Sequence, residues 1–248
     1  MPTPLPRAIL FDLDDTILDT TRSATRVWRR TAQAFEAEIG QPVEVFEPIL
    51  ERSRAWYWSD PQRNQRGRLD VQRSRVEVTH HGLKELGIDD HALAQRFAQH
   101  YSRLRISSMR PFDGALDTLQ ALVDRGVALA LLTNGDARAQ RRKVEHFDLA
   151  RHFKAVLIEG EMGFGKPDPR VFQRALRACQ ASPDEAWCVG DSLAWEVAAP
   201  QALGMRGIWN DWDGVGLPPD CETTPDRIIR SIRELHPDDT DADADPRP

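Results

Sequence analysis

Hydrophobic and polar residues follow two different rhythms along this chain. Residues 7–13 form a short apolar run, RAILFDL, which turns acidic at its end and is typical of a buried strand. From Asp19 to about Arg105 the apolar positions recur at helical spacing without any β-rich run. This region is predicted to contain four helices, over residues 20–39, 43–58, 69–86 and 89–104, separated at Gly40, at Ser59-Asp60-Pro61, at Gly67 and at Gly87.

Beyond Pro111 the rhythm changes to short apolar runs that alternate with amphipathic segments. Predicted strands cover residues 127–132, 155–158, 186–189 and 206–209, and predicted helices cover 114–124, 137–146, 169–179 and 194–203. Strands that alternate with helices in this way predict a parallel sheet with helices on both faces. We therefore expect an α/β fold, a doubly wound parallel sheet built from residues 1–18 and 108–235 and interrupted by an all-α insert at 19–107.

Composition narrows the class of protein. Of the 248 residues 40% are hydrophobic, and no run approaches the ~20 apolar residues that a membrane-spanning helix needs. The net charge is −6, but residues 236–248 hold five Asp and one Arg, so the rest shows no bias toward nucleic acid or a membrane surface. We expect this acidic tail to be disordered. Three scattered cysteines and an N-terminus unlike a signal peptide predict a cytoplasmic protein.

Polar and charged residues follow the predicted strands at the points where each one ends. They are Asp12 and Asp14 after the first strand, Thr133 and Asn134 after the second, Lys166 beyond the third and Asp191 after the fourth. In open parallel sheets, ligands bind outside the carboxyl ends of the strands. The sequence therefore predicts one site at this edge.

Three carboxylates at that edge, from Asp12, Asp14 and Asp191, would repel one another unless a hard cation neutralised them. Ligands that are all oxygen favour Mg²⁺, which keeps several waters and also binds substrate phosphate. A dianion could bind beside the metal, to positive and hydrogen-bonding groups supplied by Lys166, Thr133 and the backbone N–H groups around Asn134. The predicted ligand is a small phosphorylated metabolite. A carboxylate can attack phosphorus, and the second carboxylate of Asp-x-Asp can then serve as acid and base.

Four segments in this order, FDLDDTILDT, LLTNGD, GKPDP and VGDSLAWEV, are similar to the four motifs of the haloacid dehalogenase-like (HAD) hydrolase superfamily. The resemblance covers most of residues 7–210 and includes a helical cap inserted after the first motif. It implies Asp12 as nucleophile, Asp14 as acid and base, Thr133 and Lys166 as phosphate ligands, and Asp191 as a Mg²⁺ ligand. The backbone carbonyl of Asp14 would also touch the metal.

The stretch LLTNGDARAQRRKVEHFDL resembles the branch of this superfamily that contains N-acylneuraminate-9-phosphatases, nucleotide monophosphatases and phosphoglycolate phosphatases. The chain departs from the family pattern after the fourth motif, where Glu196 replaces the usual second Asp. The longer carboxylate of Glu196 is expected to reach the metal shell through water. In the cap, the basic segment 63–68 is expected to form a turn whose Arg66 grips a second anionic group. One tryptophan among Trp28, Trp56 and Trp58 is expected to face substrate.

Other functions remain open at the level of sequence. A 2-haloacid dehalogenase uses the same nucleophile on carbon, but it lacks the second Asp of Asp-x-Asp and needs no metal, so Asp14 and Asp191 disfavour it. A phosphomutase would keep every motif, and only a product assay separates it from a phosphatase. A non-catalytic binding relative is a third alternative, although it would have no need for a cluster of carboxylates. The sequence does not indicate an oligomeric state.

Overall fold

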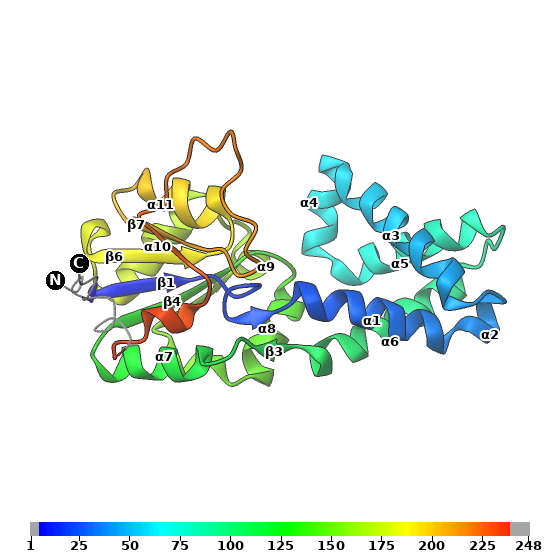
Figure 1. The fold of residues 1–248 in the computed structure, drawn as a ribbon, viewed down its shortest axis with the longest axis horizontal. Coiled ribbons are helices and arrows are strands. Elements are labelled where there is room, and N and C mark those ends of the chain that lie inside the picture. Colours follow the sequence, from blue (N-terminus) through cyan, green and yellow to red (C-terminus); the bar gives the residue numbers. More distant parts are fainter. Residues whose placement is uncertain (1–4, 239–248) are drawn as a thin grey trace, which may run out of the picture. The chain divides into compact units, whose positions relative to one another are not determined.

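The structure, a computed structural model, describes residues 5–238. It contains two compact units (Figure 1). The insert unit consists of Thr20–Met109 together with Gly135–Ala139, and the remaining described residues make up the core unit. The predicted boundaries at residues 18/19 and 107/108 lie one or two positions from these. The predicted acidic tail falls almost entirely outside the described residues.

A six-stranded parallel sheet organises the core unit, which confirms the predicted α/β fold class. Its strands are β1 (Ala8–Phe11), β4 (Ala128–Thr133), β5 (Ala155–Ile158), β6 (Ala186–Gly190), β7 (Arg206–Asn210) and β8 (Arg227–Ile229), in the order β5-β4-β1-β6-β7-β8. Phe11 of β1 lies opposite Leu131 of β4 and Val189 of β6. Figure 1 shows β1, β4, β6 and β7 side by side. The first strand in the chain therefore lies in the middle of the sheet.

Both faces of the sheet are covered, as expected for parallel strands that are apolar throughout. On one face Ile9 and Phe11 pack with α7 (Ala115–Asp124), and on the other Ala8 and Leu10 pack with α10 (Pro169–Cys179). The alternation follows from the strand geometry, in which successive side chains point to opposite faces. Two further helices complete the connections, α8 (Ala137–His146) and α9 (Glu159–Met162).

Three features of the core differ from the sequence prediction. A short antiparallel pair, β2 (Leu18–Asp19) with β3 (Arg110–Pro111), and the edge strand β8 were not predicted. The predicted helix over 194–203 is a π-helix, Leu193–Ala198, followed by α11 (Ala199–Gln201). The π-helix is a wider turn that changes which side chains face the sheet, and such turns recur at functional sites.

The insert unit is entirely helical, with α1 (Thr21–Ala34), α2 (Glu36–Ile39), α3 (Val43–Ser59), α4 (Pro61–Leu69), α5 (Val71–Glu85) and α6 (His91–Ser108). An apolar cluster that includes Val27, Phe46 and Phe97 forms its own core. The predicted helix over 20–39 is broken at Phe35, and the predicted break at Gly67 is wrong because Gly67 lies inside α4. A Cβ on Gly67 would come within 2.6 Å of Tyr57 Cε1, so this glycine permits close packing and does not form a turn.

Within residues 5–238, no helix is both long enough and apolar enough to cross a membrane.

Candidate active site

The core site lies at the carboxyl edge of the central strands. Asp12 follows β1, Thr133 ends β4, and Asp191 follows β6. Because β4, β1 and β6 are neighbours in the sheet, these three side chains start from adjacent strand ends. Lys166 comes from the loop between α9 and α10, in the segment GKPDP that also provides the α10 N-cap, Asp168.

Lys166 is the centre of a buried ion-pair cluster. Its Nζ lies 2.5 Å from Asp12 Oδ1 and 2.8 Å from Glu196 Oε1. The side chains of Lys166 and Glu196 are each only 1% exposed. A charge this deeply buried is tolerated only when it is paired, and Lys166 is paired with two carboxylates. The sequence predicted Lys166 at this edge but not its pairing with Glu196.

The titration behaviour of the site reflects an excess of negative charge. Burial raises the pKa of Asp12 to about 7, because the opposing attraction of Lys166 does not offset the loss of water and the nearby carboxylates of Glu196 and Asp14. Burial and the carboxylates of Asp12 and Glu196 raise the pKa of Asp191 to about 8. Burial lowers the pKa of Lys166, but Asp12 and Glu196 outweigh it and hold that pKa above its usual range. Asp12 and Glu196 therefore share the Lys166 ammonium group, and Asp191 lies in the field of their negative charge.

Glu196 reaches Lys166 by crossing the end of β6. Its Oε2 accepts a hydrogen bond from the backbone N–H of Ser192 at 2.8 Å, while Oε1 meets Lys166. The side chain passes directly over Gly190, where a Cβ would overlap the Glu196 side chain. The glycine of the Gly-Asp motif thus makes room for the glutamate. Oε2 of Glu196 is therefore hydrogen-bonded to the backbone, whereas Oε1 is held by the charge of Lys166.

Asp14 is held by two residues of α8 that the sequence analysis missed. Lys143 Nζ lies 2.6 and 2.7 Å from the two carboxylate oxygens of Asp14. Gln140 Nε2 donates to Asp14 Oδ2 at 2.8 Å and also to the Thr133 hydroxyl. Gln140 and Lys143 are three residues apart on one helical face, and α8 follows the end of β4. Two polar residues spaced by three in the helix that follows β4 are the sequence signal that could have identified Gln140 and Lys143.

Asn134 positions the Lys166 loop. Its amide donates to the Lys166 carbonyl at 2.7 Å and accepts from the Lys166 N–H at 2.8 Å. The neighbouring Gly165 leaves space for this contact, because a Cβ there would overlap Asn134 Oδ1 and lie 2.8 Å from Glu159 Cβ. The side chain of Asn134 is thus occupied by backbone groups, so the phosphate contact predicted at Asn134 would come from its backbone N–H, as the sequence analysis expected.

Two residues of β7 hold the turns that carry Asp12 and Asp191. Asn210 Nδ2 donates to the carbonyl of Asp15 at 3.1 Å, and Asp15 has a left-handed backbone with φ of 57°. Trp209 Nε1 donates to the carbonyl of Asp191 at 2.8 Å. These contacts hold the strand-end turns in place without using the carboxylates of Asp12 or Asp191.

The donor set fits a hard cation that takes few protein ligands. In the described part of the chain, no three His, Cys, Asp or Glu side chains are grouped so as to hold a metal by themselves. Asp12 is buried and Asp191 is half-buried at this edge, and with Glu196 they outnumber Lys166 by two charges. Mg²⁺ commonly binds through one or two carboxylates and completes its shell with water and phosphate. The residues present therefore fit Mg²⁺ through Asp12 and Asp191.

The structure places the remaining predicted residues in the insert unit. Arg66 lies on the helix α4, so the expected basic turn over 63–68 is wrong, because α4 begins at Pro61 with Asp60 as N-cap. Trp28 and Trp58 line a cavity within this unit, together with three arginines, and Arg66 does not line it.

Comparison with known proteins identifies the family of this chain. The profile of the haloacid dehalogenase-like hydrolase family matches residues 6–204. A phosphoserine phosphatase of Thermus thermophilus is 47% identical over 112 residues, which is 45% of this chain and 44% of that protein. A glyceraldehyde 3-phosphate phosphatase of Pyrococcus furiosus is 28% identical over 82% of this chain and 80% of its own. An N-acylneuraminate-9-phosphatase of Rattus norvegicus is 26% identical over 92% of both chains.

Solved structures of similar fold cover nearly the whole chain. The HAD-hydrolase YfnB of Bacillus subtilis, solved with magnesium, superposes with a TM-score of 0.72 at 24% identity, over 94% of this chain and 97% of its own. A 2-haloacid dehalogenase of Pseudomonas syringae gives a TM-score of 0.63 at 28% identity, over 96% and 99%. With the family profile spanning both units and the four motifs assembled at one sheet edge, this chain belongs to the haloacid dehalogenase-like hydrolases.

Proposed function

We propose that this hydrolase is a Mg²⁺-dependent phosphatase that releases phosphate from a small phosphorylated metabolite through a phosphorylated Asp12. The observation that carries the proposal is the set of contacts around Asp12. One of its oxygens meets Lys166, the residue is buried at the end of the central strand, and a second carboxylate, Asp14, lies two residues away.

The proposed reaction has two steps that use this chain's own groups. In the first, a carboxylate oxygen of Asp12 forms a bond to phosphorus, the ester P–O bond breaks, and Asp14 gives a proton to the leaving oxygen. In the second, Asp14 takes a proton from water, the water oxygen attacks phosphorus, and phosphate leaves as Asp12 is restored. Lys166 and the hydroxyl of Thr133 would hold the phosphoryl oxygens. The Thr133 hydroxyl keeps its own hydrogen for this contact, because Gln140 donates to it.

Asp12 and Asp191 would hold the Mg²⁺ ion, which offsets negative charge on the transferring group when bound. Glu196 is assigned a different role from the one expected from sequence. With its oxygens on Lys166 and Ser192, it positions the lysine and is not a direct metal ligand in this proposal. Lys143 and Gln140 are the positioning residues for Asp14.

Several relatives with phosphatase names, acting on phosphoserine, glyceraldehyde 3-phosphate and N-acylneuraminate 9-phosphate, favour a phosphatase over the other reactions of the family. Asp14 supports the same choice over a dehalogenase, because loss of a halide needs no proton donor. The three free cysteines, of which Cys179 and Cys188 are buried, favour a cytoplasmic location for the enzyme.

The test is phosphate release from a panel of metabolite phosphates, with Mg²⁺ and then with EDTA. We expect release with Mg²⁺ only. Asp12→Asn should abolish release, and Asp117→Asn, which changes an exposed aspartate of α7 in the same unit, should leave it unchanged. Both variants are compared by circular dichroism, so that loss of activity is separated from loss of fold. Retained activity in Asp12→Asn would remove it as the nucleophile.

The same preparations separate the alternatives. Halide release from a 2-haloacid in EDTA, without phosphate release, would identify a dehalogenase. Conversion of a sugar phosphate to its isomer without free phosphate would identify a mutase. A folded protein that gives none of these products would be a non-catalytic relative.

A further inference from the structure

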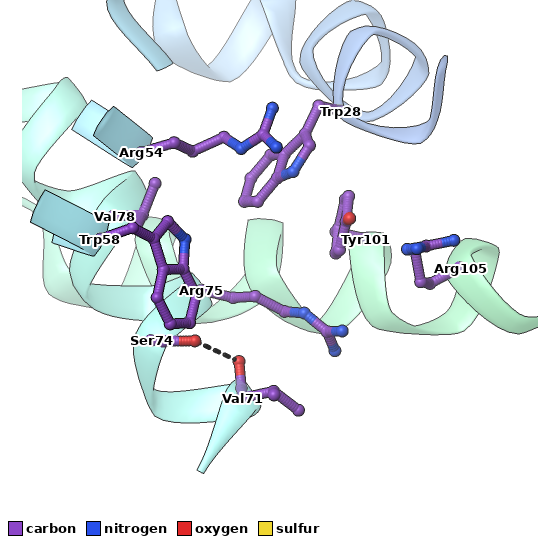
Figure 2. Close-up of a pocket in the computed structure, with 9 residues that line it drawn as sticks. All are labelled: Trp28, Arg54, Trp58, Val71, Ser74, Arg75, Val78, Tyr101 and Arg105. Atoms are coloured by element: carbon purple, nitrogen blue, oxygen red, sulfur yellow. Dashed lines mark hydrogen bonds between the residues drawn. The ribbon is translucent and has the colours of Figure 1, made fainter. Parts of the chain in front are cut away.

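The insert unit contains a cavity that the proposed chemistry does not use. It has a volume of about 190 Å³ and lies among helices α1, α3, α5 and α6. Figure 2 shows Arg54, Arg75 and Arg105 converging on it from three helices, with Trp28, Trp58 and Tyr101 as its aromatic walls. The residues that line it include no carboxylate.

Two arginines of the cavity donate hydrogen bonds to neutral acceptors. Arg75 donates to Ser102 Oγ at 2.9 Å, and Arg105 donates to Ser23 Oγ and to the Thr20 carbonyl, both at 2.6 Å. All of these acceptors are neutral. Within residues 5–238 none of the three guanidinium groups forms an ion pair, and burial lowers the pKa of Arg75. Asp136 attracts Arg75 and Arg105 repels it, and no carboxylate lines the cavity, so its positive charge is electrostatically complementary to a bound anion.

The aromatic walls define the rest of the ligand. Trp28 and Tyr101 stack with ring centroids 4.1 Å apart, and Arg54 lies 5.8 Å above the Trp28 ring. Arg75 lies 5.0 Å above the Tyr101 ring. Trp58 is 38% exposed, which leaves part of its surface for contact. A dry cavity of roughly 150 Å³ is enough to hold benzene, so this space admits a group of ring size.

We propose that this cavity binds a small organic anion, with one carboxylate or phosphate against Arg54 and Arg75 and a ring-sized apolar body against Trp28 and Trp58. Arg105 supplies a third positive charge but is already fixed by Ser23 and Thr20. The binding itself stands on the cavity alone.

Calorimetric titration of the full chain in EDTA tests the binding, with benzoate, benzyl alcohol and inorganic phosphate as probes. We expect saturable binding of benzoate and at least about tenfold weaker binding of benzyl alcohol, which lacks the charge. Arg75→Gln and Trp58→Ala should each lower the affinity for benzoate by about tenfold. Arg103→Gln, an exposed arginine of α6 that does not line the cavity, should not.

Absence of saturable benzoate binding at about 10 mM would overturn the proposal. Equal affinities for benzoate and benzyl alcohol would also overturn it. So would a loss of benzoate affinity in Arg103→Gln as large as that in Arg75→Gln. If inorganic phosphate binds as tightly as benzoate and Trp58→Ala has no effect, the aromatic part of the proposal is wrong. Because no turnover is measured, failure of the phosphatase reaction leaves these outcomes unaffected, and Asp12→Asn should bind benzoate like the parent protein.

Discussion

The pairing of Glu196 with Lys166 predicts a large stability effect from a change of one atom. Glu196→Gln keeps the size of the side chain but removes its charge, 2.8 Å from an ammonium group that is 1% exposed. Breaking a buried ion pair outright costs about 3–5 kcal/mol. Here Lys166 keeps Asp12 at 2.5 Å, so it is not left without a counter-charge. We therefore expect Glu196→Gln to lower the free energy of unfolding by about 2 kcal/mol. This value lies between the cost of losing one hydrogen bond to a charged group and the cost of leaving a buried ion without any partner.

Urea denaturation followed by circular dichroism in EDTA measures this effect. A loss of about 2 kcal/mol corresponds to a midpoint lower by about 1 M urea. The matched control is Glu161→Gln, which makes the same change in an exposed pair, Arg141–Glu161, at 2.6 Å with side chains 35% and 36% exposed. Exposed pairs contribute about 0–1 kcal/mol, so the control should lose little.

Equal losses in the two variants would refute the reasoning that burial gives the Lys166–Glu196 contact its strength. A stabilised Glu196→Gln would also refute it. That result would mean that relief of repulsion among Asp12, Asp191 and Glu196 exceeds the value of the ion pair, and Glu196 would then not be a positioning residue for Lys166.

Three further outcomes are expected. Gly190→Ala should lose about 1–3 kcal/mol in urea denaturation, because its methyl group overlaps Glu196, and an unchanged midpoint would argue against that packing. Lys143→Met should lower kcat about tenfold with little change in KM, because Asp14 loses its ion pair, and a change in KM alone would contradict a positioning role. Saturating Mg²⁺, at about 100 times its Kd, should stabilise the parent protein by about 2.7 kcal/mol in thermal denaturation, and the same shift in Asp191→Asn would remove that residue as a ligand.

Much of the fold was predictable because it depends on local patterns. The apolar run ending in Asp12 and the later alternation of strands and helices predicted the parallel sheet, and five of its six strands occur where expected. The errors fall where packing overrides local preference. Gly67 suggested a break, but it lies in a helix against Tyr57, and the predicted helix after Asp191 contains a π-helical turn that carries Glu196.

The placement of Asp12, Thr133 and Asp191 was also accessible from sequence, since each lies at the end of a strand and all strand ends of a parallel sheet meet at one edge. Their partners were not. Lys143 lies 129 residues from Asp14, and Lys166 lies 154 residues from Asp12. Nothing local specifies which ammonium meets which carboxylate, because that depends on strand order and on the direction in which α8 and the Lys166 loop leave the sheet.

The sequence by itself therefore determined the fold class, the helical insert and the group of acids, hydroxyl and lysine at one edge. Only the tertiary structure decided that Glu196 binds Lys166, that Asn134 uses its side chain on backbone groups, and that arginines from three helices of the insert share one cavity. The physical reason is common to all three. Periodicity records which face of an element is buried, whereas the pairing of buried charges depends on distances across elements that are far apart in the chain.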